Sequence, residues 1–412
     1  MKLRVNIGWM ILGNGTFAGF QWLYLVTVAR LCGLEDAGAY ALCQSVIYPV
    51  FAFCNLNLRQ LQVTHRGEHV FSIYFRFASL SALAATVVSL IAFSLLIDVE
   101  VHGLPLFAPL CAASIVAALS DACYGHMQSK ENMQSIAVSL ILRNSIAFPI
   151  FGAMIYSGLP LWHAAFSIPI VWLSVLLVHD IYAVNERPSI LLSLRLFDKR
   201  HLGIIRYGLP MGGLIFFNQL YLNSPRLVLE HYSGLAAVGQ YAPIASLIAL
   251  GAFVVNAVTN SALPRLVNLH QANNVNGFYN LSLKLLALAC AIGMSGLVVG
   301  TLFRQELLSA IFGDLHPGSE EILIIVLTAS LFWYLSAASG TCLTATRSFS
   351  SQFRISIIVF VATIGACLVA IEKFGAIGAA CALALGACVK FTIQTILVIR
   401  QHRKRLSRSL AP

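Results

Sequence analysis

The chain is dominated by long apolar runs, each about as long as a helix that crosses a bilayer. The hydrocarbon core takes roughly 20 apolar residues as helix, and lipid offers no partner to an unpaired backbone amide. We therefore expect about twelve spanning helices. They cover 7–28, 39–58, 73–97, 104–124, 136–156, 161–184, 207–229, 238–262, 281–303, 322–344, 353–371 and 376–399.

The polar residues between these runs are too few for a soluble domain. Only 10% of the 412 residues are charged and 58% are hydrophobic, whereas a soluble domain carries about 25% charged residues. The composition predicts an all-α polytopic membrane protein. The first run follows Lys2 and Arg4 as a signal peptide would, but it is too long and no small-residue cleavage site follows, so we expect it to remain as a helix.

The loop charges predict the orientation. An even number of spans places both termini on one side, and most loop Lys and Arg fall on that side. The other side holds Arg30, Arg304 and Lys373, Arg226 near the outer end of the seventh span, and most of the loop acids. By the positive-inside rule, we expect both termini in the cytoplasm.

The net charge of +10 does not require nucleic acid as a partner. The basic tail, 401–412, is typical of juxtamembrane segments that lie against anionic cytoplasmic lipid. The cysteines form no C-x-x-C pair, so we expect neither a metal site nor a disulfide framework, and no cofactor.

The sequence also repeats itself. GLEDAGAYA at 33–41 follows the first span, and GLAAVGQYA at 234–242 follows the seventh, at a constant offset of 201. We expect the glycines of both copies, Gly33, Gly38, Gly234 and Gly239, to form tight turns that need positive φ or close backbone approach. The tyrosines Tyr40 and Tyr241 are expected at the membrane interface.

The repeat predicts two six-helix lobes in parallel orientation. The N-terminal lobe is expected over 1–184, a cytoplasmic inter-lobe loop over 185–206, and the C-terminal lobe over 207–400. Parallel repeats about an axis along the membrane normal are typical of transporters that bind substrate between the halves.

Several motifs resemble a known family in their order and spacing. They are VAR at 28–30, GAY at 38–40, NLNLR at 55–59, PR at 225–226, VGQY at 238–241 and GAIGAA at 375–380. Together they resemble the Wzx-type polysaccharide flippases of the multidrug/oligosaccharidyl-lipid/polysaccharide (MOP) exporter superfamily. The family often has an acid before the arginine of its seventh helix, where this chain has Pro225.

The resemblance implies a MATE-like fold, a bacterial inner-membrane location and a transport activity. The implied substrate is an undecaprenyl-pyrophosphate-linked oligosaccharide, flipped to the periplasmic leaflet for O-antigen (lipopolysaccharide), capsule or exopolysaccharide synthesis. The implied partners are this lipid-linked oligosaccharide, membrane lipid, a polysaccharide polymerase and a chain-length regulator. No enzymatic activity is implied.

Charged residues inside the spans are the candidates for substrate binding, because burying them in a membrane costs about 2.5–3.5 kcal/mol on insertion scales. The cations are Arg143, Lys390 and Arg226, and the acids are Asp121 and Asp180. Arg can hold a pyrophosphate bidentately, whereas Lys acts as a point charge. The alternative is that these groups snorkel to the interface or pair with one another.

Uncharged polar residues in the first and seventh spans are further candidates. In this superfamily these helices line the cleft, which favours Asn14, Gln21 and Asn218 as residues that bind sugar hydroxyls. The alternative is that they form helix–helix hydrogen bonds.

Three other functions fit this sequence less well. A cation-coupled small-molecule exporter of the same superfamily usually has a carboxylate on its first helix, and 7–28 has none. A membrane polymerase or glycosyltransferase usually needs a large polar loop or a carboxylate cluster. A peptidoglycan-precursor flippase usually has two further helices, for which this chain has no residues.

Overall fold

The computed structural model describes residues 2–64, 71–97, 104–184, 200–314 and 316–409, and these ranges contain helices and no strand. The predicted spans lie largely on helices, although the span 39–58 runs past the end of α2 into a turn at 55–57. The helices before residue 185 are α1 (Lys2–Leu31), α2 (Leu34–Cys54), α3 (Leu58–Thr64), α4 (Phe71–Leu96), α5 (Leu104–Ser129), α6 (Met133–Tyr156), α7 (Leu161–Ala165), α8 (Ser167–Val175), the π-helix η1 (Leu176–Asp180) and α9 (Ile181–Val184). The later ones are α11 (Arg200–Ala245), α12 (Leu247–Gln271), α13 (Val275–Leu302), α14 (Arg304–Phe312), α15 (Ser319–Ala345) and α16 (Phe349–Ser409).

Nine helical stretches in the described ranges are long and apolar enough to cross a membrane. Two of them, Gly208–Gln271 and Phe349–Arg403, are 64 and 55 residues long. Each is broken by a glycine with non-helical backbone angles, Gly234 in α11 and Gly375 in α16. The predicted first span, α1, is not among the nine, because polar residues such as Asn14 and Gln21 dilute its apolar run.

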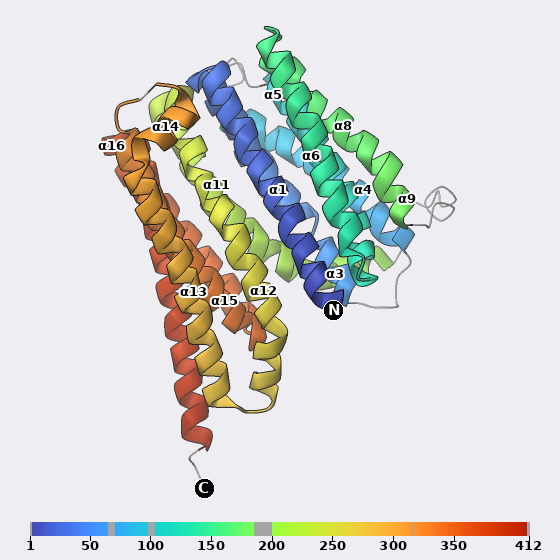
Figure 1. Ribbon diagram of the computed structural model, residues 1–412, viewed down its shortest axis with the longest axis vertical. Coiled ribbons are helices and arrows are strands. Elements are labelled where there is room, and N and C mark those ends of the chain that lie inside the picture. The colour runs from blue at the N-terminus through green and yellow to red at the C-terminus, as the bar shows by residue number, and fades with distance from the viewer. Residues whose placement is uncertain (1, 65–70, 98–103, 185–199, 315, 410–412) are drawn as a thin grey trace. The chain divides into compact units, whose positions relative to one another are not determined.

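The chain forms two compact units, Met1–Asn223 and Ser224–Pro412. In the first unit, α6 packs against α1 and α8, and α5 packs against α3, α4 and α8 (Figure 1). Its core includes Leu56, Phe77 and Ala122, and Ile204 at the start of α11 packs into it. The predicted inter-lobe boundary stays a prediction, and residues 185–199 of that loop lie outside the described residues.

In the second unit, α15 is the central helix and contacts α12, α13 and α16 (Figure 1). Its core includes Val255, Leu285, Tyr334 and Cys342. Arg304 forms an ion pair with Glu320, which ties the start of α14 to the start of α15 (Nε–Oε2 2.6 Å).

The two copies of the glycine repeat have the same backbone geometry. Gly33 has φ 101° and Gly234 has φ 76°, and each directly precedes helical residues. The prediction of positive φ is confirmed for Gly33 and Gly234 and is wrong for Gly38 and Gly239, which lie inside α2 and α11. The interface position predicted for the repeat tyrosines is wrong, because Tyr40 and Tyr241 are 1% and 0% exposed. Each lies seven residues into its helix and faces the core of its own unit.

Candidate functional site

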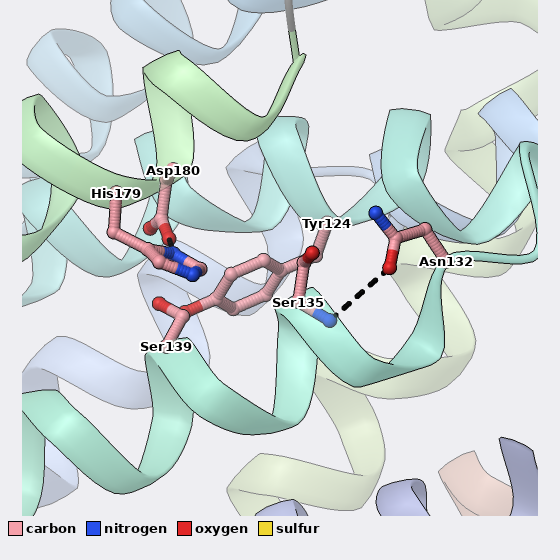
Figure 2. Close-up of polar contacts among 6 residues, drawn as sticks. All are labelled: Tyr124, Asn132, Ser135, Ser139, His179 and Asp180. Atoms are coloured by element: carbon pink, nitrogen blue, oxygen red, sulfur yellow. Dashed lines mark hydrogen bonds and ion pairs between the residues drawn. The ribbon is translucent and has the colours of Figure 1, made fainter. Parts of the chain in front are cut away.

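The candidate site of the first unit is centred on Arg143, which α6 carries into the interior. The helix begins at Asn132, whose side chain accepts a hydrogen bond from the backbone N–H of Ser135 at 3.2 Å (Figure 2). This N-cap satisfies one of the amides that the first helical turn leaves unpaired. Eleven positions after the cap, Arg143 is only 4% exposed.

Aromatic rings surround the guanidinium of Arg143. Its central carbon lies 4.4 Å from the ring centroid of Trp172, 5.0 Å from that of Phe17 and 5.7 Å from that of Tyr124. These residues come from α8, α1 and α5, so the packing of four helices holds the cation in place. A desolvated cation–π contact contributes about 2 kcal/mol.

The rings attract the charge of Arg143 but do not satisfy its donors. Its Nε and Nη1 are buried and have no hydrogen-bond partner among the described residues. None of the described carboxylates lies within ion-pair distance of this guanidinium. Each unsatisfied buried donor costs about 1–3 kcal/mol, more for a charged group. The site therefore offers N–H groups that could donate hydrogen bonds to an anion or a water molecule.

A second guanidinium, that of Arg59, lies beside the same tyrosine. Arg59 of α3 is 5.8 Å from the ring centroid of Tyr124, and its Nε donates to Gln128 Oε1 at 2.7 Å. In the sequence, Arg59 directly follows the second predicted span, a position typical of a loop cation. Its place in the NLNLR motif was the one available signal for a role in a site.

The buried acid of the site is Asp180, the last residue of the π-helix η1. It is 0% exposed, its Oδ1 lies 3.0 Å from Nδ1 of His179, and its Oδ2 has no partner among the described residues. Figure 2 shows both side chains beside Tyr124, whose hydroxyl forms a 2.7 Å hydrogen bond with Ser139 of α6. Short π-helical turns frequently mark functional sites.

The second acid, Asp121 of α5, is exposed and lies in the electrostatic field of Arg59, Arg143 and Asp180. Two guanidiniums and two carboxylates thus share this part of the first unit. Their formal charges cancel, so an incoming anion would compete with Asp121 and Asp180 for the cations.

The polar candidates of α1 are neighbours along the helix of Phe17, one of the rings around Arg143. Asn14, Phe17 and Gln21 are spaced three and four residues apart, which places them on one face of the helix. Asn14 donates to the backbone oxygen of Met10 at 2.8 Å, and Gln21 accepts from the hydroxyl of Tyr48 at 3.4 Å. Gln21 thereby takes part in a helix–helix hydrogen bond. Asn218 of α11 is half-buried.

The remaining candidates, Lys390 and Arg226, belong to the second unit. Lys390 of α16 is 9% exposed, with its ammonium 4.2 Å from the ring centroid of Trp333. Arg226 donates to the hydroxyl of Ser246 at 3.3 Å. The structure thus groups Arg143, Asp121 and Asp180 in one cluster and places Lys390 and Arg226 in the other unit.

These side chains offer charge and hydrogen bonds rather than a metal site. Within the part of the chain that the structure describes, no group of three or more His, Cys, Asp or Glu side chains could hold a metal ion. Planar guanidiniums match phosphate oxygens bidentately, and aromatic rings with amides suit polar ligands. The cluster can therefore hold and release an anionic group.

Comparison with known proteins covers most of the chain. The family model described as polysaccharide biosynthesis protein matches residues 3–270. The capsular polysaccharide biosynthesis protein CapF of Staphylococcus aureus is 23% identical over 381 residues, covering 91% of this chain and 94% of that protein. The succinoglycan biosynthesis transport protein ExoT of Rhizobium meliloti (strain 1021) is 25% identical over 247 residues, covering 57% of this chain and 48% of that protein.

The fold has known structural relatives as well. A multidrug resistance MATE family transporter of the MOP superfamily, solved in an inward-facing conformation, superposes with a TM-score of 0.76 at 14% identity. The match covers 98% of this chain and 96% of that one. These findings confirm the resemblance seen in the motifs. With more than half of its residues matched by the family model, the chain belongs to the polysaccharide biosynthesis protein family and has the fold of MOP-superfamily transporters.

Proposed function

We propose that this protein is a flippase for a lipid-linked oligosaccharide. It carries an undecaprenyl-pyrophosphate-linked unit from the cytoplasmic to the periplasmic leaflet by alternating access, for O-antigen, capsule or exopolysaccharide synthesis. Family membership supports a role in polysaccharide biosynthesis. The relatives named for capsular polysaccharide biosynthesis and succinoglycan transport agree with that role.

The observation that carries the proposal concerns Arg143. Its buried Nε and Nη1 have no hydrogen-bond partner among the described residues, and three aromatic rings lie around its charge. An arginine that served only to stabilise the fold would be expected to pair with a carboxylate or carbonyl oxygens. A diphosphate oxygen would satisfy these donors through charge-assisted hydrogen bonds.

Arg59 extends the cationic site, because its guanidinium also lies near the Tyr124 ring. A diphosphate carries two phosphoryl groups, so two guanidiniums near one ring match it better than one. We assign Arg143 the buried phosphoryl group and the half-exposed Arg59 the outer one.

Asp121 and Asp180 act as the resident counter-charges of this site. They form no ion pair with Arg143 among the described residues, but their negative charge repels a bound diphosphate. This repulsion weakens net binding, which a transporter needs because the substrate must be released on the far side.

The other candidates are assigned to the glycan. Asn14, Gln21 and Asn218 bind sugar hydroxyls, and Lys390 and Arg226 line the cavity on the C-terminal side. The ammonium of Lys390 beside the Trp333 ring supports this assignment, because an indole and a donor group together suit a sugar.

The proposed topology has twelve spans with both termini in the cytoplasm of the bacterial inner membrane. Nine stretches of the described residues are long and apolar enough to span, and two of them are long enough for two crossings each. With α1 added, these stretches give the proposed twelve spans. The proposed lobes are 1–184 and 207–400, with the loop 185–206 and the tail 401–412 in the cytoplasm. A polysaccharide polymerase and a chain-length regulator are the proposed downstream partners.

The test is complementation of a strain from which the gene has been deleted. We expect loss of surface polysaccharide and accumulation of complete lipid-linked units on the cytoplasmic leaflet. Wild-type protein and Arg354→Ala, which alters an exposed arginine, should restore the polysaccharide, whereas Arg143→Ala and Lys390→Ala at equal expression should not. Units that were chemically incomplete, or translocated but unpolymerised, would contradict the proposal.

A further inference from the structure

A pocket in the second unit lies where four helices end on one face. The end of α12, the start of α13, the end of α15 and the last turns of α16 surround this small pocket. Its polar lining comprises His270, Thr346, Gln401 and His402, and its apolar lining includes Phe278 and Val398. None of these residues belongs to the proposed transport site.

Contacts with neighbouring side chains hold the polar lining in place. The His402 ring stacks on Tyr279, with centroids 4.5 Å apart and an interplanar angle of 23°. Gln401 donates to the hydroxyl of Ser348 at 3.0 Å. The rings of His270 and Phe278 lie 5.9 Å apart. An imidazole offers an N–H donor in either tautomer, so this half of the pocket presents fixed donors.

The surrounding charge is of one sign. Residues 231–305, 322–371 and 373–412, which supply all four helix ends, contain no Asp or Glu. The same ends carry the exposed cations Arg265, Arg347, Arg400 and Arg403. Such a face attracts an anion and has no acid of its own to compete for the cations.

The depth of the pocket matches the lipid headgroups. From the break at Gly375 to Gln401, α16 rises about 39 Å at 1.5 Å per residue. The hydrocarbon core is about 30 Å thick and the bilayer with its headgroups about 40–45 Å. With Gly375 at the opposite face, as in the proposed topology on which this inference rests, Gln401 and His402 lie beyond the hydrocarbon, and Phe278 and Val398 are available to the glycerol backbone and the first acyl carbons.

We propose that this pocket binds the headgroup phosphate of an anionic phospholipid. His270, His402 and Gln401 hold the phosphate, Arg400 and Arg403 supply the charge around it, and the apolar lining contacts the lipid below it. Basic pockets between spanning helices at a membrane face recognise such headgroups. The bound lipid ties together the ends of α12, α13, α15 and α16.

The test measures thermal unfolding of the delipidated full-length protein in detergent, with phosphatidylglycerol, phosphatidylcholine or inorganic phosphate added. Native mass spectrometry counts the retained lipid. The variant His402→Phe keeps an aromatic ring on Tyr279 and removes the N–H donors. The matched control is His163→Phe, since His163 also stacks on a ring, Trp162 at 3.4 Å, but lies in the first unit.

We expect phosphatidylglycerol to raise the Tm of the wild type and of His163→Phe, and phosphatidylcholine to raise it less. In His402→Phe and in Arg403→Gln, the apparent affinity for phosphatidylglycerol should fall about tenfold, the effect of one charge-assisted hydrogen bond. Arg403 is exposed, so its variant is expected to fold. An unchanged affinity in both variants, an equal effect of phosphatidylcholine, or a full effect of inorganic phosphate alone would overturn the proposal.

Discussion

The guanidinium of Arg143 lies 4.4 Å from the ring centroid of Trp172, within a shell of aromatic rings rather than beside a carboxylate. This arrangement keeps the positive charge inside the unit and leaves two donor nitrogens without a partner among the described residues. A lysine would keep the charge but would lose the planar fork that stacks on rings and grips phosphate bidentately.

The first prediction follows from this geometry. Arg143→Lys should lower the transport rate by about tenfold, the cost of one charge-assisted hydrogen bond, while Arg143→Ala should abolish transport. Surface polysaccharide per expressed protein is the measurement, and Arg354→Lys is the control. A fully active Arg143→Lys variant would show that only the charge matters and would contradict the bidentate role.

The second prediction concerns the buried acid. Asp180→Asn removes a resident counter-charge, so the cations should hold the diphosphate about tenfold more tightly and release it more slowly. Binding of a synthetic polyprenyl-pyrophosphate oligosaccharide to purified protein should strengthen while turnover falls. Weaker binding in Asp180→Asn would show that the acid supports the site instead of competing with the substrate.

The third prediction tests the packing of α1 on α6. A Cβ at Gly13 would lie 2.7 Å from the Cα of Ala137, whereas one at Gly19 would meet no atom within 4 Å. Gly13→Ala should therefore destabilise the protein by about 1–3 kcal/mol through overpacking. Gly19→Ala, the matched control on the same helix, should keep or slightly raise the Tm. Equal Tm values for the two variants would place α1 elsewhere.

The fourth prediction concerns Cys32, which follows α1 in the turn before Gly33. Burial, together with the nearby Asp36, raises the pKa of Cys32 to about 11. A raised pKa favours the neutral thiol, so thiolate is scarce at pH 7 and labelling should speed up about tenfold per pH unit as the pH rises towards 10. Asp36→Asn should speed up labelling at a fixed pH.

The same residue reports the topology. In a variant that retains only Cys32 of the ten cysteines, an impermeant maleimide should label intact cells. A variant with Arg347→Cys as its single cysteine should be labelled only after the cells are opened. The reverse pattern would contradict the proposed orientation of both termini.

Much of the fold could be predicted from the sequence because each span can be recognised from its own residues alone. Apolar length places a helix at 281–303 without knowledge of its neighbours, and a repeated glycine turn predicts the backbone of Gly33 and Gly234. Tertiary packing is not local in this sense. Tyr40 looked like an interface residue because it follows a polar turn, but its burial depends on which helices pack around α2.

In the candidate site, too, some residues could be predicted from local sequence and others depend on packing. Arg143, Asp121 and Asp180 stood out because each is an ionisable group inside an apolar run. The residues that give Arg143 its character, Phe17 and Trp172, come from helices far apart in the sequence. The sequence of a membrane span does not indicate which of its aromatic residues lies beside a cation. A role of Arg59 in the site could not be predicted for another reason, because a cation at the end of a span is ordinarily a signal of membrane topology.

The most direct test of the account is transport in reconstituted vesicles. A synthetic polyprenyl-pyrophosphate oligosaccharide is placed in both leaflets, and an impermeant glycosidase digests the glycan of the outer leaflet. Vesicles with wild-type protein should lose nearly all of the glycan with time, whereas vesicles with Arg143→Ala should stop near one half, as protein-free vesicles do. If wild-type and protein-free vesicles both stop near one half, the protein is not a flippase for this lipid.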